Sequence, residues 1–352
     1  MAAPKRVPVP SAKPPVKPAV KAPARPANAR AAAKKPESPA VPKPAPRRRI
    51  DRSSTLRVLI AGASGMIGTE LVRQLESAGH TVQTLVRREP MQPSEFTWAP
   101  DAKILDFRLL DDVDAVINLS GASLNRLPWT GGWKKEILRS RIKATSALVE
   151  AMGMASSPPP VFLSGSAVGF YGNRPGETLT ESSSKGTGFL ADVVEEWEAT
   201  ARLVPASTRT VLLRTGVVLG TGGALGPLKA LTKLGVSGPL GGGAQHWPWV
   251  SLHDEAAAIV HLLTSSVAGP VNITGPTPAV ENEIGRALAE QLHRPYAIPA
   301  PRFALELALG DAGRELLLAD QLVTPAVLLA DGFSFRHTTS TEAITAAVES
   351  WS

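Results

Sequence analysis

Three glycines in one short stretch have the spacing of a diphosphate-binding turn. Four apolar residues, 58–61, precede a turn that reads Gly62-Ala63-Ser64-Gly65-Met66-Ile67-Gly68, and an amphipathic segment follows. A buried strand, a glycine turn and a helix in this order bind dinucleotides, because glycine permits a tight turn and lets backbone N–H groups approach phosphate oxygens. We therefore expect cofactor contacts from Gly62, Ser64, Gly65, Met66, Ile67 and Gly68. A plain glycine-rich turn is the alternative.

Two arginines stand about 20 residues past this turn, where such a fold contacts the adenosine ribose. Arg87 and Arg88 end the next predicted strand. An acid there would favour the free 2′-hydroxyl of NAD, whereas a guanidinium matches the 2′-phosphate of NADP in charge and geometry. The pair favours NADP(H) over NAD(H), although Glu89 is a rival that would favour NAD(H).

A segment of small residues follows a later predicted strand. It reads Asn118-Leu119-Ser120-Gly121-Ala122. In a doubly wound sheet this strand end faces the cofactor, and small residues leave room for the nucleotide. We expect Leu119, Gly121 and Ala122 to contact the cofactor.

The elements that must hold these residues alternate between strands and helices. Strands are predicted at 58–61, 81–86, 115–119, 161–164, 210–214 and 271–274, and helices at 69–78, 134–152, 188–203, 254–265 and 281–293. Strands separated by helices pair in parallel through right-handed crossovers. The pattern predicts an α/β fold with a Rossmann-like doubly wound sheet over residues 56–297. Residues 298–350 are predicted to form a small C-terminal α/β lobe of short helices, with 333–335 as a lone strand.

The first 55 residues differ in composition from the rest. Residues 1–56 carry 14 Lys and Arg residues against Glu37 and Asp51, a net charge of +12, whereas the whole chain is +7. Frequent proline and few apolar side chains predict a disordered basic tail over 1–55. We expect at most weak, salt-dependent contact with polyanions, and a solubilising extension without a specific partner is the alternative.

Composition also excludes several classes of protein and site. The chain has no cysteine, which removes disulfides and thiolate catalysis, and its six histidines show no spacing that would hold a metal. No apolar run is long enough to span a membrane and no secretory signal is visible. These features predict a cytoplasmic protein, either monomeric or homodimeric.

Several motifs together resemble the extended short-chain dehydrogenase/reductase superfamily. Within it, the chain is similar to an epimerase-like family that has a C-terminal domain of unknown function. The resemblance covers roughly residues 57–344 and is carried by the glycine turn, the 118–122 segment, Ser164-Gly165-Ser166 with Tyr171, Trp129-Thr130, Ser140-Arg141-Ile142 with Thr145, Phe189-Leu190-Ala191, Trp197-Glu198, Gly238-Pro239-Leu240-Gly241, Gln245, Trp249 and Gly332-Phe333.

The chain departs from this superfamily at the residues that move protons. The superfamily uses a tyrosine with a lysine four residues later, but Tyr171 is followed by Pro175, and Phe189 occupies the place of that tyrosine. The resemblance implies that Ser166 orients a carbonyl or hydroxyl group, and it leaves Tyr171 as the replacement acid/base. A hydrogen-bonded serine at a strand end and a half-buried packing tyrosine are the alternative.

The resemblance also suggests a substrate pocket and a range of functions. It places Gln245 and Trp249 at the pocket, and Asp254 reads most simply as the N-cap of the next helix. The first hypothesis is an NADP(H)-dependent oxidoreductase or epimerase-like enzyme acting on a small polar substrate. The second is a cofactor-binding sensor or scaffold without catalysis, since some relatives are associated with cell division.

Overall fold

The computed structural model describes residues 54–220 and 222–351. The predicted tail therefore lies almost wholly outside the described residues. The predicted boundary between residues 297 and 298 stays a prediction. Within the described residues, no helix is long and apolar enough to cross a membrane.

A seven-stranded parallel sheet forms the centre of the described chain, in the order β10-β7-β5-β4-β1-β2-β3. Its strands are β1 (Arg57–Ala61), β2 (Thr81–Val86), β3 (Glu95–Thr97), β4 (Ala115–Asn118), β5 (Val161–Ala167), β7 (Arg209–Thr215) and β10 (Gly269–Ile273). The order runs one way from β1 through β2 to β3, and the other way from β4 onward. This reversal confirms the predicted doubly wound sheet and opens a crevice at the carboxyl ends of β1 and β4.

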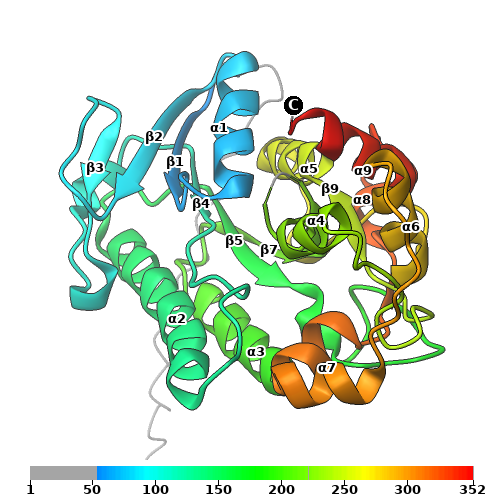
Figure 1. Ribbon diagram of the computed structural model, residues 1–352. Coiled ribbons are helices and arrows are strands. Elements are labelled where there is room, and N and C mark those ends of the chain that lie inside the picture. The colour runs from blue at the N-terminus through cyan, green and yellow to red at the C-terminus, as the bar shows by residue number, and fades with distance from the viewer. Residues whose placement is uncertain (1–53, 221, 352) are drawn as a thin grey trace, which may run out of the picture. The chain divides into compact units, whose positions relative to one another are not determined.

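Helices cover both faces of the sheet (Figure 1). Helices α1 (Met66–Ser77) and α5 (Leu252–Thr264) pack on one face, and α2 (Gly131–Met154) and α3 (Phe189–Ala201) pack together on the other. Alternation along β1 shows why: Val58 and Ile60 join the core under α1 and α5, whereas Leu59 and Ala61 join the core under α2. Strand β1 is thus buried on both faces of the sheet.

The C-terminal part is mostly helical and is joined to the rest by a short pair of strands. It contains α6 (Glu281–Gln291), α7 (Arg302–Leu309), α8 (Ala326–Ala330) and α9 (Ser340–Glu349), while α4 (Leu225–Lys233) precedes it. Two small parallel sheets pair β11 (Leu322–Val323) with β6 (Thr178–Leu179) and β8 (Val217–Leu219) with β9 (Trp249–Ser251).

The strand predicted at 333–335 is wrong. The segment has no strand partner among the described residues, and its aromatic side chains pack against each other and against His261 of α5. The Phe333 ring lies 4.8 Å from the Phe335 ring and 5.5 Å from the ring of His261, each in an edge-on arrangement. Apolar alternation in this segment reports side-chain packing, not backbone pairing.

Candidate functional site

A cleft of about 1020 Å³ lies at the carboxyl ends of the strands on either side of the sheet's reversal. It is lined by these residues of the predicted cofactor site: Gly62, Ser64, Gly65, Arg87, Arg88, Leu119, Gly121 and Ala122. The side chains of Met66 and Ile67, together with Gly68, do not line it, because these residues form the first turn of α1. The structure thus brings three separate segments of the sequence to one cleft.

Two of the glycines in the turn occupy positions where a side chain does not fit. Gly62 has φ of +90°, and a Cβ there would lie 2.8 Å from the carbonyl carbon of Leu119. A Cβ on Gly68 would lie 2.4 Å from the carbonyl oxygen of Gly62. Gly62 therefore permits the tight turn, and Gly68 permits α1 to lie against it.

The start of α1 is built to receive an anion. Its N-cap residue is Gly65, which supplies no side-chain hydrogen bond, and its first turn contains no acid. The Gly65 amide donates to the Gly62 carbonyl (3.1 Å) within the turn. The next amides, those of Met66 and Ile67, have no partner within the helix and carry the positive end of its dipole. A diphosphate fits this end of the cleft.

The structure gives the two neighbouring arginines different environments. Arg88 forms a two-pronged ion pair with Glu95, at 2.8 and 2.6 Å, and hydrogen bonds from Arg88 and the Met91 amide lower the pKa of Glu95 to about 2. Arg87 lines the cleft and donates no hydrogen bond among the described residues; its charge reaches only Asp101. Arg87 is therefore the guanidinium available to a ligand.

The 119–122 segment is held in place from α2. The Asn118 side chain accepts from the Ser120 amide (3.1 Å), the Ser140 hydroxyl accepts from the Ala122 amide (2.9 Å), and Arg141 donates to the Ala122 carbonyl (3.2 Å). Burial lowers the pKa of Arg141 to about 10. Ser140 and Arg141 thus hold the 119–122 segment in place. Ser140 lines the cleft, whereas Arg141 does not.

One wall of the cleft was not predicted from the sequence. It is a face of α2 formed by Trp133, Glu136, Ser140, Lys143 and Ala144. The signal was present, since the first four residues recur at intervals of three and four, and Ala144 lies four residues after Ser140, so that all five share one side of a helix. Because these residues differ in polarity, this face lacks the apolar stripe by which a packed helix face is identified in a sequence.

The predicted catalytic residues, Ser166 and Tyr171, are joined by a buried ion pair. The Ser166 hydroxyl donates to Glu198 (2.7 Å), and Arg214 donates to both oxygens of Glu198, at 2.8 and 3.1 Å. Arg214 also donates to the Tyr171 oxygen (3.0 Å), and the Tyr171 hydroxyl donates to Asn272 (2.7 Å). Neither Ser166 nor Tyr171 lines the cleft, and Tyr171 is 0% exposed.

The charges of this network are set by burial and by Arg214. Burial raises the pKa of Tyr171, against the opposing effect of Arg214. Burial would also raise the pKa of Glu198, but the hydrogen bond and charge of Arg214, with smaller contributions from the Ser166 hydrogen bond and the charge of Arg202, outweigh it and hold that pKa below its ordinary value. Glu198 is therefore an anion paired with a cation in the core. The catalytic roles of Ser166 and Tyr171 stay predictions.

Phe189, which replaces the superfamily's tyrosine, takes part in packing. Its ring lies 5.7 Å from the Trp129 ring, edge to face. Its backbone amide and that of Leu190 donate to the carboxylate of Glu315, at 2.9 and 2.7 Å. A carboxylate from the C-terminal part thus caps the start of α3.

The role of Gln245 and Trp249 at a substrate pocket stays a prediction. Both are buried, at 9% and 1% exposure. Gln245 donates to the carbonyls of Leu240 and Leu317, and the Trp249 indole donates to Thr277. A cavity of about 10 Å³ lies beside Trp249. Both side chains hold loops together.

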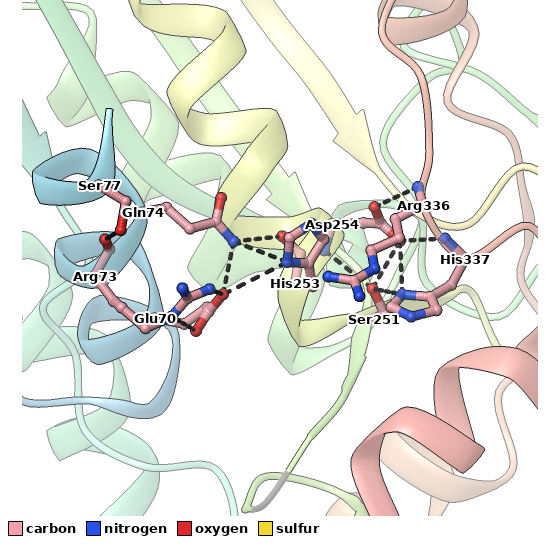
Figure 2. Close-up of polar contacts among 9 residues, drawn as sticks. All are labelled: Glu70, Arg73, Gln74, Ser77, Ser251, His253, Asp254, Arg336 and His337. Carbon is pink, nitrogen blue, oxygen red and sulfur yellow. Dashed lines mark hydrogen bonds and ion pairs between the residues drawn. The ribbon is translucent and has the colours of Figure 1, made fainter. Parts of the chain in front are cut away.

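The expected N-cap of α5 is also corrected. Ser251 is the cap, since its hydroxyl accepts from the Asp254 amide (3.0 Å). Asp254, 1% exposed, accepts hydrogen bonds from the backbone amides of Arg336 (2.8 Å) and His337 (3.0 Å), as Figure 2 shows. Asp254 therefore fastens a C-terminal segment to the start of α5.

The polar contacts around the start of α5 extend to α1 (Figure 2). Gln74 on α1 donates to the carbonyl of His253 (3.1 Å), and the His253 ring lies 3.7 Å from the Glu70 carboxylate. Burial lowers the pKa of His253. Helix α1, the start of α5 and the 336–337 segment are thus connected by polar contacts. Across the described residues, no group of three or more His, Asp or Glu side chains could hold a metal ion.

Comparisons with known proteins agree with this geometry. Residues 58–274 match the NAD dependent epimerase/dehydratase family, and residues 300–347 match a domain of unknown function, DUF1731. Epimerase family protein ML0860 of Mycobacterium leprae is 39% identical over 293 residues, which cover 82% of this chain and 95% of the relative. Epimerase family protein SDR39U1 of Homo sapiens is 36% identical over 285 residues, 80% of this chain and 95% of the relative.

A solved structure of that human protein has the same fold. The crystal structure of human epimerase family protein SDR39U1 (isoform2) with NADPH superposes with a TM-score of 0.78 at 32% identity, over 84% of this chain and 99% of that one.

Proposed function

Because the chain belongs to the NAD dependent epimerase/dehydratase family, we propose that it binds NADP(H) in the cleft at β1 and β4 and acts on a small polar substrate beside it. When bound, the nicotinamide would donate or accept a hydride. The amides at the start of α1 would hold the diphosphate, Arg87 would hold the 2′-phosphate, and the 119–122 segment would leave room for the nicotinamide riboside.

One observation carries the choice of cofactor: Arg87 lines the cleft and has no hydrogen-bond partner among the described residues, while its neighbour Arg88 is paired with Glu95. An unpaired guanidinium in a cleft that already fits a dinucleotide matches a phosphate dianion better than a ribose hydroxyl. The NADPH in the crystal structure of the human relative supports this choice.

Replacing Arg87 by alanine should weaken NADPH binding by about 10-fold or more, since a hydrogen bond between charged groups contributes roughly 1.5–3 kcal/mol. NADH affinity should stay within twofold, because NADH lacks the 2′-phosphate. Titration calorimetry with both cofactors measures the two changes. Arg88→Ala is the matched control and should change NADPH affinity by less than about threefold. Equal affinity of the parent chain for NADPH and NADH would sink the proposal.

Two candidate functions remain for a protein that binds NADP(H) in this way. In the first, the protein is an enzyme in which Ser166 orients the reacting group and Tyr171 moves the proton. In the second, it is a cofactor-binding sensor or scaffold. The burial of Tyr171, whose hydroxyl is already held by Arg214 and Asn272, counts against Tyr171 as the acid/base of the first candidate, since an acid/base must come within hydrogen-bond reach of its substrate.

A Tyr171→Phe variant tests these candidates. We expect it to keep NADPH affinity within twofold and to lose about 1–2 kcal/mol of stability, because two buried polar groups lose a partner. NADPH oxidation with a panel of small carbonyl compounds gives the second readout. A fall of about 100-fold or more in turnover would support the enzyme with Tyr171 as its acid/base. Retained turnover would remove Tyr171 from that role, and no turnover in either protein would support the sensor.

A further inference from the structure

A second cavity, of about 450 Å³, adjoins the cofactor cleft at the start of α2. It is lined by Arg126, Leu127, Pro128, Thr130, Gly132 and Trp133. Trp133 lines both this cavity and the cofactor cleft, so its side chain forms part of a shared wall. A molecule in the second cavity would therefore lie next to a bound cofactor.

The cavity contains a guanidinium that is positioned but not neutralised. The central carbon of Arg126 lies 4.5 Å from the centre of the Trp133 ring, a cation–π contact that orients the planar group. Arg126 makes no hydrogen bond and no ion pair with any described residue. Its N–H donors therefore have no acceptor among the described residues, and a planar fork of N–H groups matches a phosphate or a carboxylate.

The surroundings of Arg126 are positive as well. No acidic residue lines the cavity. Thr130 caps α2 by accepting from the Trp133 amide (3.2 Å), which leaves the amides of Gly131 and Gly132 at the positive end of a 24-residue helix. Oxyanions would be attracted here, and cations repelled.

We propose that this cavity, here named the Arg126 cavity, binds an oxyanion group, a phosphate or a carboxylate, of the molecule on which the cofactor acts. The inference rests on the proposed function, since it places the anionic end of the substrate across Trp133 from NADP(H). It narrows the substrate to an anionic small molecule and assigns Arg126 as the residue that selects it.

Inorganic phosphate and acetate are the probes, titrated separately into the full chain saturated with NADPH. Ionic strength is held constant, because screening alone weakens exposed charge pairs. We expect saturable binding of at least one anion, seen as a change in tryptophan fluorescence and confirmed by calorimetry. Arg126→Ala should weaken it 10-fold or more, and Arg126→Lys should restore part of it. Binding of phosphate but not acetate would identify a phosphorylated substrate, and the reverse a carboxylate.

Arg286→Ala is the matched control, because Arg286 also lies over an aromatic ring, that of Tyr296 at 5.4 Å, but outside both cavities. It should bind the probe like the parent chain. The inference would be overturned if the Arg126→Ala variant bound phosphate and acetate as the parent chain does. It would also be overturned if adding phosphate released bound NADPH, because the anion would then occupy the cofactor's own phosphate site. Failure of NADPH to bind in anion-free buffer would instead count against the proposed function, so the two failures are distinguishable.

Discussion

Replacing Glu198 by glutamine should lower the free energy of unfolding by about 3–5 kcal/mol, the usual cost of removing one partner of a buried ion pair. Glu198 is 1% exposed and Arg214 is 3% exposed, so water cannot solvate the Arg214 charge that the substitution leaves unpaired. Glutamine keeps the size of the side chain, and the effect therefore reports charge, not a cavity. Urea unfolding followed by circular dichroism measures it.

Glu195→Gln is the matched control on the same helix. Glu195 pairs with Lys185 at 2.6 Å, but its side chain is 59% exposed, and we expect a change below about 1 kcal/mol. A double variant, Glu198→Gln with Arg214→Met, should recover part of the loss because no unpaired charge stays in the core. A Glu198→Gln protein as stable as the parent would show that the pair contributes nothing.

The same residue predicts a dependence on pH. Because the pKa of Glu198 is lower in the folded chain than its ordinary value of 4.5, its contribution to stability is fully present above that value. The contribution is lost as the pH falls below 4.5 and through the folded pKa. The Glu198→Gln variant should therefore lose less stability than the parent between neutral and acidic pH.

Gly68→Ala should weaken NADPH binding by about 10–100-fold and lower stability by about 1–3 kcal/mol, the usual cost of an overpacked site. The added Cβ would lie 2.4 Å from the Gly62 carbonyl oxygen, so α1 must move away from the turn. That movement displaces the amides that hold the diphosphate. Calorimetry with NADPH and thermal unfolding measure the two effects.

Gly153→Ala provides the comparison for a helical glycine without this contact. No heavy atom lies within 4 Å of a Cβ at Gly153, near the end of α2. Alanine favours a helix over glycine by roughly 1 kcal/mol, so stability should stay the same or rise and NADPH affinity should not change. Equal NADPH affinity in Gly68→Ala and Gly153→Ala would refute the role of close packing at the turn.

Local patterns in the sequence predicted most of the sheet and the glycine turn. Strand β2 has the predicted bounds of 81–86, and β1 begins one residue before its prediction. Helix α2 starts at Gly131, three residues before its predicted start, because Thr130 caps it. The three-residue strand β3 and helix α4 were missed, since β3 is too short to show a period.

The partners of the site residues were not predictable in the same way. Glu198 lies 32 residues from Ser166 and 16 from Arg214, and only the crossover through α3 brings the three together. From the sequence alone, Arg87 and Arg88 are equally good candidates to bind the 2′-phosphate. Only the pairing of β3 with β2 brings Glu95 to Arg88 and so distinguishes the two arginines. Burial of Tyr171 likewise follows from packing by the C-terminal part. Spacing indicates which residues share an edge of the sheet, but not which are already neutralised.

The contacts of Asp254 and His253 should couple the free energy of nucleotide binding to the attachment of a distant segment of the chain. They join α1, whose first amides we propose to hold the diphosphate, to a segment at positions 336 and 337. Any nucleotide that steadies α1 should then also tighten the attachment of that distant segment, and a perturbation near position 336 should be felt as altered nucleotide affinity. Thermodynamic linkage requires the two effects to be equal in size.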